Sequence, residues 1–315
     1  MGAFTFEWTW IVQDIIIYLL AILVVIFIIK KEHKPIPILL EFVCFVFLYA
    51  AVYENFATLM GWYGYGRSIL MVFNVPLSVP VIEYLVVYAG IRLAKKMNLK
   101  VWMIPIFVGF LGTLLDFSLD PLSVSQIHVT LENTIGRWTW YPASGNVAIF
   151  DIPIYNFTGW FLLCGYATVV ILQGRFWQSR AKRPLLIGYL YPPIALLVGL
   201  LIMISPLSNF LLWLGPFLAK GSFAEYIMLG LAFTAFLSVL IYFFTRRRST
   251  EKFSFKEEWP LWVVFAVSHV SDILFTLIGG YWSILPLVLG ASVFHMFILF
   301  MLFRFRAKKK PNASI

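Results

Sequence analysis

The chain has 315 residues, of which 61% are hydrophobic and only 12% carry a formal charge. Its mean hydropathy of +0.88 is far above that of a soluble globular domain, so the composition excludes a soluble fold and indicates a protein that crosses the membrane several times. The net charge is +9. We interpret this charge as a result of membrane topology and contact with anionic lipids, and we expect no nucleic-acid partner.

Apolar segments of about 20 residues, the length that crosses a hydrocarbon core of about 30 Å, recur along the whole chain. The short alternating segments that mark a β-barrel are absent, so we predict an all-α bundle of about nine transmembrane helices. In chain order the predicted spans are 11–29, 38–59, 70–93, 101–115, 152–172, 185–204, 226–244, 260–278 and 285–303. We treat residues 1–315 as a single transmembrane domain.

Two stretches do not fit this regular plan. The apolar stretch 210–217 is too short for a span, so we predict a re-entrant or interfacial segment there. The loop 121–150 is the longest connection in the chain. We expect it to form a partly folded cap over a cavity in the outer half of the membrane.

Lysines and arginines indicate the orientation. Most of the 24 basic residues lie in the loops after the first, third, fifth, seventh and ninth predicted spans, which all fall on one side of the membrane. The positive-inside rule places that side in the cytoplasm, with the N-terminus outside and the C-terminus inside. We therefore expect a multi-pass integral protein of the cell membrane.

Two aspartates stand out at the end of the fourth predicted span, in the sequence LLDFSLDP at 114–121. Asp116 and Asp120 are four residues apart, so they share one face of a helix and each changes the proton affinity of the other. Like charges in a dry site cannot both ionise easily. We expect one carboxyl to keep its proton, which places an acid beside a base. Asp120 also fits a simple turn at a helix end, because a proline follows it.

Several other polar residues map with this pair to the outer half of the membrane, where ionisable groups are costly and normally serve a site. The candidates on this side are Glu54, Asn55, Asp116, Asp120, Arg137, Asn146, Asp151, Asn156 and Asp272. We predict that the helical bundle brings these side chains together near the 121–150 loop.

Some acidic residues also fit structural roles. Asp151 stands before an Ile-Pro dipeptide and fits a helix N-cap. His269 and Asp272 are three residues apart on one helical face and fit a hydrogen-bonded pair. Asp14, near the outer end of the first span, fits the membrane interface. Glu83 lies deep in the third predicted span, where a charge normally faces the bundle interior.

The sequence WTWY at 138–141 gathers aromatic side chains within the long loop. Trp138 and Trp140 fit an aromatic belt at the level of the lipid headgroups. They also fit the wall of a pocket for an isoprenoid chain, because aromatic faces stabilise passing cations.

Five stretches of the sequence carry a resemblance to a known family. They are YENFATLMGWYGYGRSIL at 53–70, PLSVPVIEYLVVYAG at 76–90, LGTLLDFSLDP at 111–121, WTWYPASG at 138–145 and FDIPIYNFTGWF at 150–161. In this order and spacing they resemble the family of carotenoid-biosynthesis membrane proteins that includes the bisanhydrobacterioruberin hydratases. The resemblance covers about residues 50–165, and the rest of the chain shares mainly its hydropathy.

The resemblance implies a membrane hydratase, which adds water to a trisubstituted double bond of a long isoprenoid chain and forms a tertiary alcohol. Such a reaction needs a strong proton donor, a pocket that tolerates a tertiary carbocation and a positioned water molecule. The substrate would be a carotenoid end group or the geranylgeranyl chain of an archaeal ether lipid, delivered from the bilayer. We expect no cofactor and no metal ion.

On this interpretation Asp116 and Asp120 are the catalytic acid and base, in an order that the motif leaves open, and Glu54 and Asp151 support them. The residues expected to bind substrate are Asn55, Tyr63, Glu83, Arg137, Trp138, Trp140, Asn156, Trp160, His269 and Asp272. Arg137 and Lys220 are basic residues on the outer side. They would contact a phosphate headgroup if the substrate is a lipid, and they also fit lone exposed charges without a specific role.

Two other classes of protein fit part of the pattern. An intramembrane prenyltransferase of the ubiquinone type would hold magnesium and diphosphate with paired aspartate-rich motifs, but DFSLD occurs once, without a second matching cluster. A proton-coupled transporter would use Glu83, His269 and Asp272 as a relay, but the sequence has no internal repeat. Dependence on magnesium or on a proton gradient would separate these classes from a hydratase.

Overall fold

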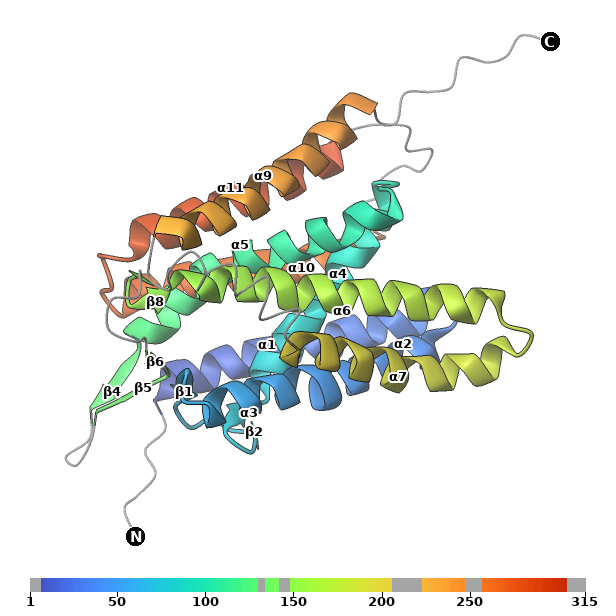
Figure 1. Ribbon diagram of the computed structural model, residues 1–315. Helices are drawn as coiled ribbons and strands as arrows, with labels where there is room; N and C mark the ends of the chain where they lie inside the picture. Colours follow the sequence, from blue (N-terminus) through green and yellow to red (C-terminus); the bar gives the residue numbers. More distant parts are fainter. Residues whose placement is uncertain (1–6, 130–133, 142–147, 206–222, 247–256, 305–315) are drawn as a thin grey trace.

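The computed structural model describes residues 7–129, 134–141, 148–205, 223–246 and 257–304. Within these ranges the chain is a membrane protein built as an all-α helical bundle, as predicted, and short two-stranded ribbons lie at one of its ends (Figure 1). Eight helical spans are long and apolar enough to cross a membrane among the residues described. The segment 210–217, predicted to be re-entrant or interfacial, lies outside the described residues.

The helices are α1 (Trp8–Lys31), α2 (Pro35–Cys44), α3 (Ala51–Leu59), α4 (Ser78–Lys96), α5 (Ile104–Ser125), α6 (Ile154–Arg180), α7 (Pro184–Ile204), α9 (Phe223–Arg246), α10 (Trp259–Ile278) and α11 (Leu285–Arg304). A π-helical segment, Phe45–Ala50, joins α2 to α3, and a 3-10 turn, Val101–Met103, precedes α5. Prolines stand in the first turn of α2, α5, α7 and α10, where the missing N–H costs no helical hydrogen bond.

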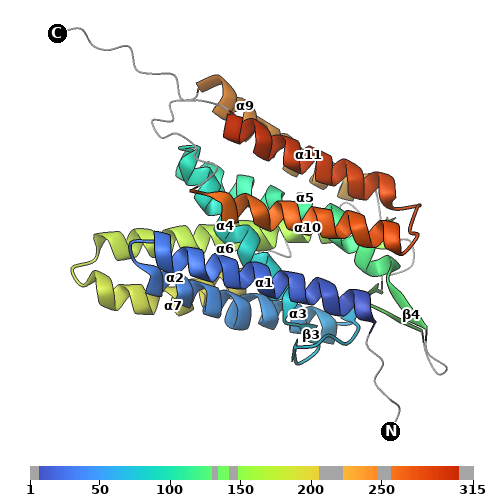
Figure 2. The same ribbon diagram turned by 180° about the vertical axis from the view of Figure 1, so that it is seen from behind.

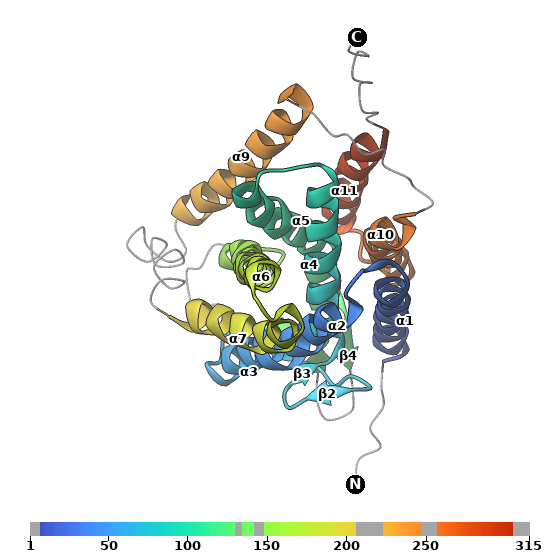
Figure 3. The ribbon, with the colours of Figure 1, turned by 90° about the vertical axis from the view of Figure 1, so that its right-hand side faces the viewer.

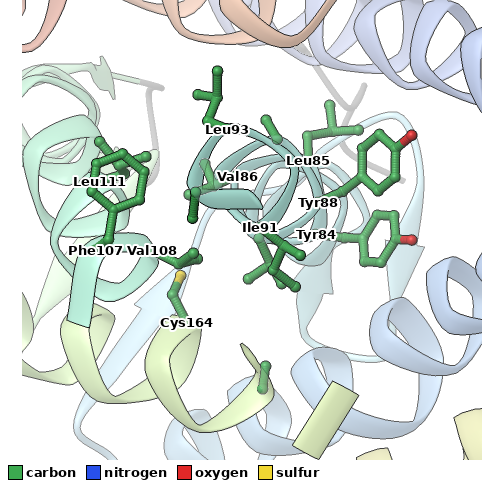
Figure 4. Close-up of a cluster of buried hydrophobic side chains, with 14 of the residues drawn as sticks. Tyr84, Leu85, Val86, Tyr88, Ile91, Leu93, Phe107, Val108, Leu111 and Cys164 are labelled. Atoms are coloured by element: carbon green, nitrogen blue, oxygen red, sulfur yellow. The ribbon is translucent and has the colours of Figure 1, made fainter. Parts of the chain in front are cut away.

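Helices α4 and α5 occupy the middle of the bundle, and the other helices surround them (Figure 3). α5 packs against α4, α6, α9, α10 and α11. α4 is apolar on nearly all sides, which is typical of a buried helix, and almost all of its residues are buried. Apolar side chains of α4, α5 and α6 fill the centre of the bundle, among them Val86, Phe107 and Cys164 (Figure 4).

The third predicted span is shorter in the structure than in the sequence-based prediction. α4 begins at Ser78 rather than at residue 70, because the preceding residues form a ribbon of β2 (Met71–Val72) and β3 (Val75–Pro76). With 19 residues, α4 is not among the eight long apolar spans. The reason is its charge and not its length, because α4 carries Glu83 and, in its last turns, Arg92, Lys95 and Lys96.

The fourth predicted span is longer than expected. α5 does not end at residue 115 but continues through Pro121 to Ser125. The neighbouring helices bury almost all of this last part, and that packing outweighs the local preference of proline for a helix end. Asp116 and Asp120 therefore lie inside a helix, and the interpretation of Asp120 as a turn residue at a helix end is wrong.

Short ribbons occupy the connections at one end of the bundle. Besides β2 and β3, the antiparallel pairs are β1 (Tyr63–Tyr65) with β6 (Trp138–Trp140), β4 (Ile127–Val129) with β5 (Thr134–Gly136), and β7 (Ala148–Ile149) with β8 (Ile152–Pro153). The basic ends of α1, α4 and α6 lie at the opposite end of the bundle (Figures 1 and 2). In the stretch predicted as a long loop, α5 thus continues to Ser125, and strands β4 to β7 lie between residues 127 and 149.

Two glycines let α5 and α6 approach each other closely. A Cβ atom on Gly109 would lie 2.5 Å from the carbonyl oxygen of Phe161, and one on Gly112 would lie 2.8 Å from Sγ of Cys164. No side chain fits at Gly109 unless the backbone of α6 moves. This contact brings the start of α6 beside the last turns of α5, where the candidate residues lie.

Candidate active site

Asn156 joins the two aspartates of α5. Its amide nitrogen, at the start of α6, donates hydrogen bonds to Oδ2 of Asp116 at 2.7 Å and to Oδ2 of Asp120 at 2.6 Å. The two carboxyl groups also interact directly with each other, and all three side chains are buried. The structure therefore brings the predicted aspartates and Asn156 together as one hydrogen-bonded unit.

A second hydrogen-bonded group forms around Glu54 of α3. Its Oε2 atom accepts hydrogen bonds from the hydroxyl of Tyr63 at 2.6 Å and from the hydroxyl of Tyr65 at 2.5 Å. Both tyrosines come from β1, where alternate residues point to the same side. Burial, reinforced by the nearby carboxyl of Glu54, raises the pKa of both tyrosines well above the usual value, so their hydroxyls remain donors.

The π-helical segment explains why Glu54 points into the bundle. A π turn holds one residue more than an α turn and rotates the helix that follows it. In α3 this rotation leaves Val52 and Phe56 on the exposed face, while Glu54 is buried. The orientation of Glu54 toward the site thus depends on Phe45–Ala50, a segment that the sequence analysis predicted as ordinary α-helix.

A small cavity lies where these two groups meet. Its lining consists of Glu54, Tyr63, Tyr65, Val79, Glu83, Asp120, Trp138, Trp140, Asn156 and Trp160. The volume of about 20 Å³ is enough for a single water molecule. The described residues that line it include three carboxylic acids and no basic side chain.

Glu83 of α4 completes a group of four buried carboxyl groups. It is close enough to Glu54 and to Asp116 to interact with both electrostatically. One carboxyl oxygen of Glu83, of Asp116 and of Asp120 has no hydrogen-bond partner among the described residues. Such oxygens are available to a water molecule or to a reacting group. Within the described ranges, no three His, Cys, Asp or Glu side chains are arranged to hold a metal ion.

Aromatic rings form the other wall of the cavity. Because β1 pairs with β6 in register, Tyr63 faces Trp140 with ring centroids 4.5 Å apart, and Tyr65 faces Trp138 at 5.6 Å. Trp160 of α6 adds a third indole. Aromatic faces stabilise cations. Buried carboxyl groups beside such faces fit acid catalysis that passes through a carbocation.

Asp151 lies outside this cavity, contrary to the sequence-based prediction. It is exposed in the tight turn between β7 and β8, with a φ of 64°. The interpretation as an N-cap is also wrong, because α6 begins at Ile154 after Pro153, without a side-chain cap. The motif places Asp151 next to α6 in sequence, but the turn directs it away from the carboxyl cluster.

Asn55 also lies apart from the cavity. Its amide nitrogen donates to the carbonyl oxygens of Ala51 at 2.7 Å and Val72 at 3.0 Å, and its Oδ1 accepts from the backbone N–H of Asn74 at 3.0 Å. These bonds fix the β2–β3 ribbon to α3. Asn55 therefore supports the wall of the site and does not line the cavity.

Arg137 is buried, and so the structure corrects its predicted contact with a headgroup. Its guanidinium pairs with Asp14 at 3.3 Å and bonds to the side-chain oxygens of Gln13 and Gln126. Burial lowers the pKa of Arg137, and the carboxylate of Asp14 opposes that shift. The predicted interfacial position of Asp14 is also wrong, since only 1% of it is exposed. Asn146 and Lys220 lie outside the described residues.

His269 and Asp272 belong to a separate buried cluster. The hydroxyl of Ser118 donates to Oδ2 of Asp272 at 2.7 Å and lies 2.9 Å from Nδ1 of His269, whose Nε2 lies 2.9 Å from Nδ1 of His295. Ser118 is two residues from each aspartate of the pair, so it faces the opposite side of α5. The expectation that His269 and Asp272 line the same site as the aspartates is therefore wrong.

Three residues of these clusters escaped the sequence-based prediction. Tyr65 had a signal, because the alternation in YGY at 63–65 places it on the same side as Tyr63. Ser118, between the two aspartates, and His295, in the last helix, had none. Their partners in the cluster, His269 and Asp272, are more than 20 residues away in sequence, and only the packing of α10 and α11 on α5 brings them together.

Fold and site together define a helical membrane protein with a buried cluster of carboxyl groups beneath a wall of aromatic rings. A family model described as carotenoid biosynthesis protein matches residues 13–237. The chain therefore belongs to the family of carotenoid biosynthesis proteins, as the sequence motifs predicted. The match includes all four buried carboxyl groups, while α10 and α11 lie beyond it. No curated protein and no solved structure gives a significant match.

Proposed function

We propose that this carotenoid biosynthesis protein is a hydratase, which adds water to a trisubstituted double bond of a long isoprenoid chain. The observation that carries the proposal is the pair of carboxyl groups of Asp116 and Asp120, bridged by the amide of Asn156 beside a cavity for one water molecule. Alkene hydration requires an acid, a base and a single water molecule, and these groups provide a place for all three.

The chemistry follows from the carboxyl pair. The protonated carboxyl gives its proton to the less substituted carbon of the double bond, and the other carbon becomes a tertiary carbocation. The indoles of Trp138, Trp140 and Trp160 stabilise this cation through their ring faces. The oxygen of water then forms the new C–O bond, and the proton that it releases returns to a carboxylate. The carboxyl cluster is thus regenerated, and the product is a tertiary alcohol.

The substrate in this proposal is the end group of a carotenoid or the geranylgeranyl chain of an ether lipid. Both are apolar chains that reach the protein through the bilayer, and family membership favours the carotenoid. We further propose that the protein is a multi-pass protein of the cell membrane, with its basic helix ends in the cytoplasm and its ribbons outside.

Mass spectrometry of extracts tests the proposal directly. Cells that contain an acyclic carotenoid pathway or a geranylgeranyl lipid pathway would express the protein, the Asp116→Asn variant, and the control Glu257→Gln on the exposed surface. We expect the mass of one water to be added to one class of substrate by the protein and by the control, but not by Asp116→Asn. No added water in either pathway would overturn the proposal.

The same experiment separates the alternative classes. A product that gains an isoprenyl unit, and is lost when magnesium is chelated, would indicate a prenyltransferase. Unchanged substrates together with transport that stops when the proton gradient is collapsed would indicate a transporter.

A further inference from the structure

Two hollows of very different size meet at β1. The small cavity described above has about 20 Å³, while an open groove of about 420 Å³ lies on the other side of the strand. Tyr63 and Tyr65 line both of them. Hydroxyl, amide and guanidinium groups of Thr58, Asn74 and Arg67 contribute to the lining of the groove, so it suits water.

Tyr63 and Tyr65 are the residues that the two hollows share. Their hydroxyls donate to Oε2 of Glu54 at 2.6 and 2.5 Å. Gly64 between them has no side chain, and a Cβ atom there would lie 3.1 Å from the hydroxyl of Tyr141, which also lines the groove. Water that enters the cavity from the groove therefore passes the two hydroxyls and meets Glu54 first.

The carboxyl groups differ in the number of hydrogen bonds that they accept. A single oxygen of Glu54 accepts two O–H donors, which is a setting that favours a carboxylate. Asp116 and Asp120 share the one amide group of Asn156, and each keeps an Oδ1 atom without a donor among the described residues. A carboxyl group that carries its own proton needs fewer donors. The hydrogen-bond geometry therefore assigns the role of the base to Glu54.

We infer that the groove supplies the water of the reaction, that Tyr63 and Tyr65 admit it to the cavity, and that Glu54 orients and deprotonates it. The aspartate pair then has the single task of protonating the double bond. This inference rests on the proposed hydratase function and divides its chemistry between two sides of one cavity.

Atoms and charges balance in this scheme. The proton of the aspartate pair forms the new C–H bond, the oxygen of water forms the C–O bond, and Glu54 takes the proton that this water molecule loses. The next water molecule in the cavity, which Glu54 and Asp120 both line, passes the proton from Glu54 back to the aspartate pair.

Deuterium labelling distinguishes protonation of the double bond by the aspartate pair from activation of water by Glu54. In D2O the protein forms an alcohol that carries one deuterium on the neighbouring carbon. In Glu54→Gln the aspartate pair still deuterates the double bond, but the cation loses a proton to the aspartate instead of gaining water. We expect the alcohol to fall roughly 100-fold, with deuterium accumulating in the recovered alkene. Asp116→Asn is expected to stop both processes.

The outcomes keep the two proposals apart. If the unaltered protein forms no alcohol, the hydratase proposal fails, and this inference fails with it. If the unaltered protein forms alcohol but Glu54→Gln and Asp116→Asn lose alcohol and deuterium uptake to the same extent, the hydratase stands and the division of tasks is wrong. Thermal unfolding in detergent identifies a variant that has lost its fold, and Tyr65→Phe then replaces Glu54→Gln in the same assay.

Blocking the groove tests the path of water without touching a carboxyl group. Gly64→Leu fills the groove beside Tyr141, whereas Gly230→Leu adds the same side chain on α9, where no atom of the described residues lies within 4 Å of the added Cβ. We expect Gly64→Leu to lose alcohol and to retain deuterium uptake, and Gly230→Leu to keep both. Equal alcohol from the two variants would overturn the proposed path.

A thiol at the mouth of the groove tests the side from which water comes. Asn74→Cys would be labelled with a membrane-impermeant maleimide on intact cells, with the native protein and its Cys44 and Cys164 as background. Labelling above background on intact cells supports a groove that opens outside. Labelling that requires permeabilised cells would overturn that part of the inference.

Discussion

The amide nitrogen of Asn156 lies 2.6 Å from Oδ2 of Asp120 and so connects the first turn of α6 to the buried end of α5. The same nitrogen holds Asp116, so the geometry of the carboxyl pair depends on a single NH₂ group. Asn156→Asp keeps the size of the side chain and replaces this donor by a third carboxyl group. We expect activity to fall by roughly 100-fold or more, measured as alcohol formed in membranes.

The control for this variant is Asn98→Asp, which makes the same change at an exposed position. Asn98 has a positive φ of 54°, a conformation that aspartate also tolerates. Activity equal to that of the unaltered protein is expected for the control. If Asn156→Asp were as active as the control, the bridge between the aspartates would have no part in catalysis.

Stability at alkaline pH should depend on Tyr63 and Tyr65. Burial raises the pKa of both hydroxyls in the folded protein, while in the unfolded chain they ionise near pH 10. Above that pH the unfolded chain binds fewer protons than the folded protein, so the free energy of unfolding falls as pH rises. We expect the melting temperature in detergent to fall less steeply above pH 10 in the double variant Tyr63→Phe, Tyr65→Phe. Identical slopes would mean that these hydroxyls are not shielded.

The buried pair of Arg137 and Asp14 should contribute to stability. Removing one partner leaves the other charge buried and unpaired, so we expect Arg137→Gln to lower the free energy of unfolding by about 3–5 kcal/mol. Arg180→Gln removes an exposed arginine and serves as the control. Combining Arg137→Gln with Asp14→Asn should recover part of the loss in a double-mutant cycle. A purely additive result would show that the two charges are not coupled.

Arg137 also shows where sequence reasoning reached its limit. Hydropathy correctly predicted the helical class, because apolar segments recur along the chain, and the motifs correctly predicted the family. The two aspartates lie together as expected, because residues four apart share one face of a helix. Asp14, the partner of Arg137, is 123 residues away in sequence, so neither its burial nor its ion pair leaves a local signal. The same holds for Ser118 and His295, which meet only through helix packing.

The sequence also failed to predict where the helices end and where their geometry changes. The prediction ended the fourth span at residue 115, because aspartates and a proline follow, whereas burial by neighbouring helices carries α5 to Ser125. The π-helical segment Phe45–Ala50 was likewise invisible, since its residues are as apolar as those of an α-helix. Both errors affect where the carboxyl groups lie in the bundle.

Asp151 matches the family motif but lies outside the candidate active site. The motif gave it a catalytic part, but its side chain is exposed at a positive φ of 64° in the β7–β8 turn. Asp151→Asn keeps a residue that tolerates this conformation. We therefore expect the same yield of alcohol and the same melting temperature as for the unaltered protein. A loss of activity with an unchanged melting temperature would return Asp151 to the site.

The close contact between α5 and α6 should be as important as the carboxyl groups themselves. A methyl group at Gly109 would lie 2.5 Å from the carbonyl oxygen of Phe161, which belongs to the backbone and cannot rotate away. Gly109→Ala therefore forces α6 outward and draws Asn156 away from Asp116 and Asp120. We expect lower thermal stability and a loss of alcohol formation.

Gly165→Ala is the matched control for this contact. It adds the same methyl group on α6, but the nearest atom, the carbonyl oxygen of Pro105, would lie at an ordinary distance of 3.6 Å. Because alanine favours a helix more than glycine does, this variant should be at least as stable as the unaltered protein and fully active. If Gly109→Ala behaved like Gly165→Ala, the spacing of α5 and α6 would not set the geometry of the aspartate pair.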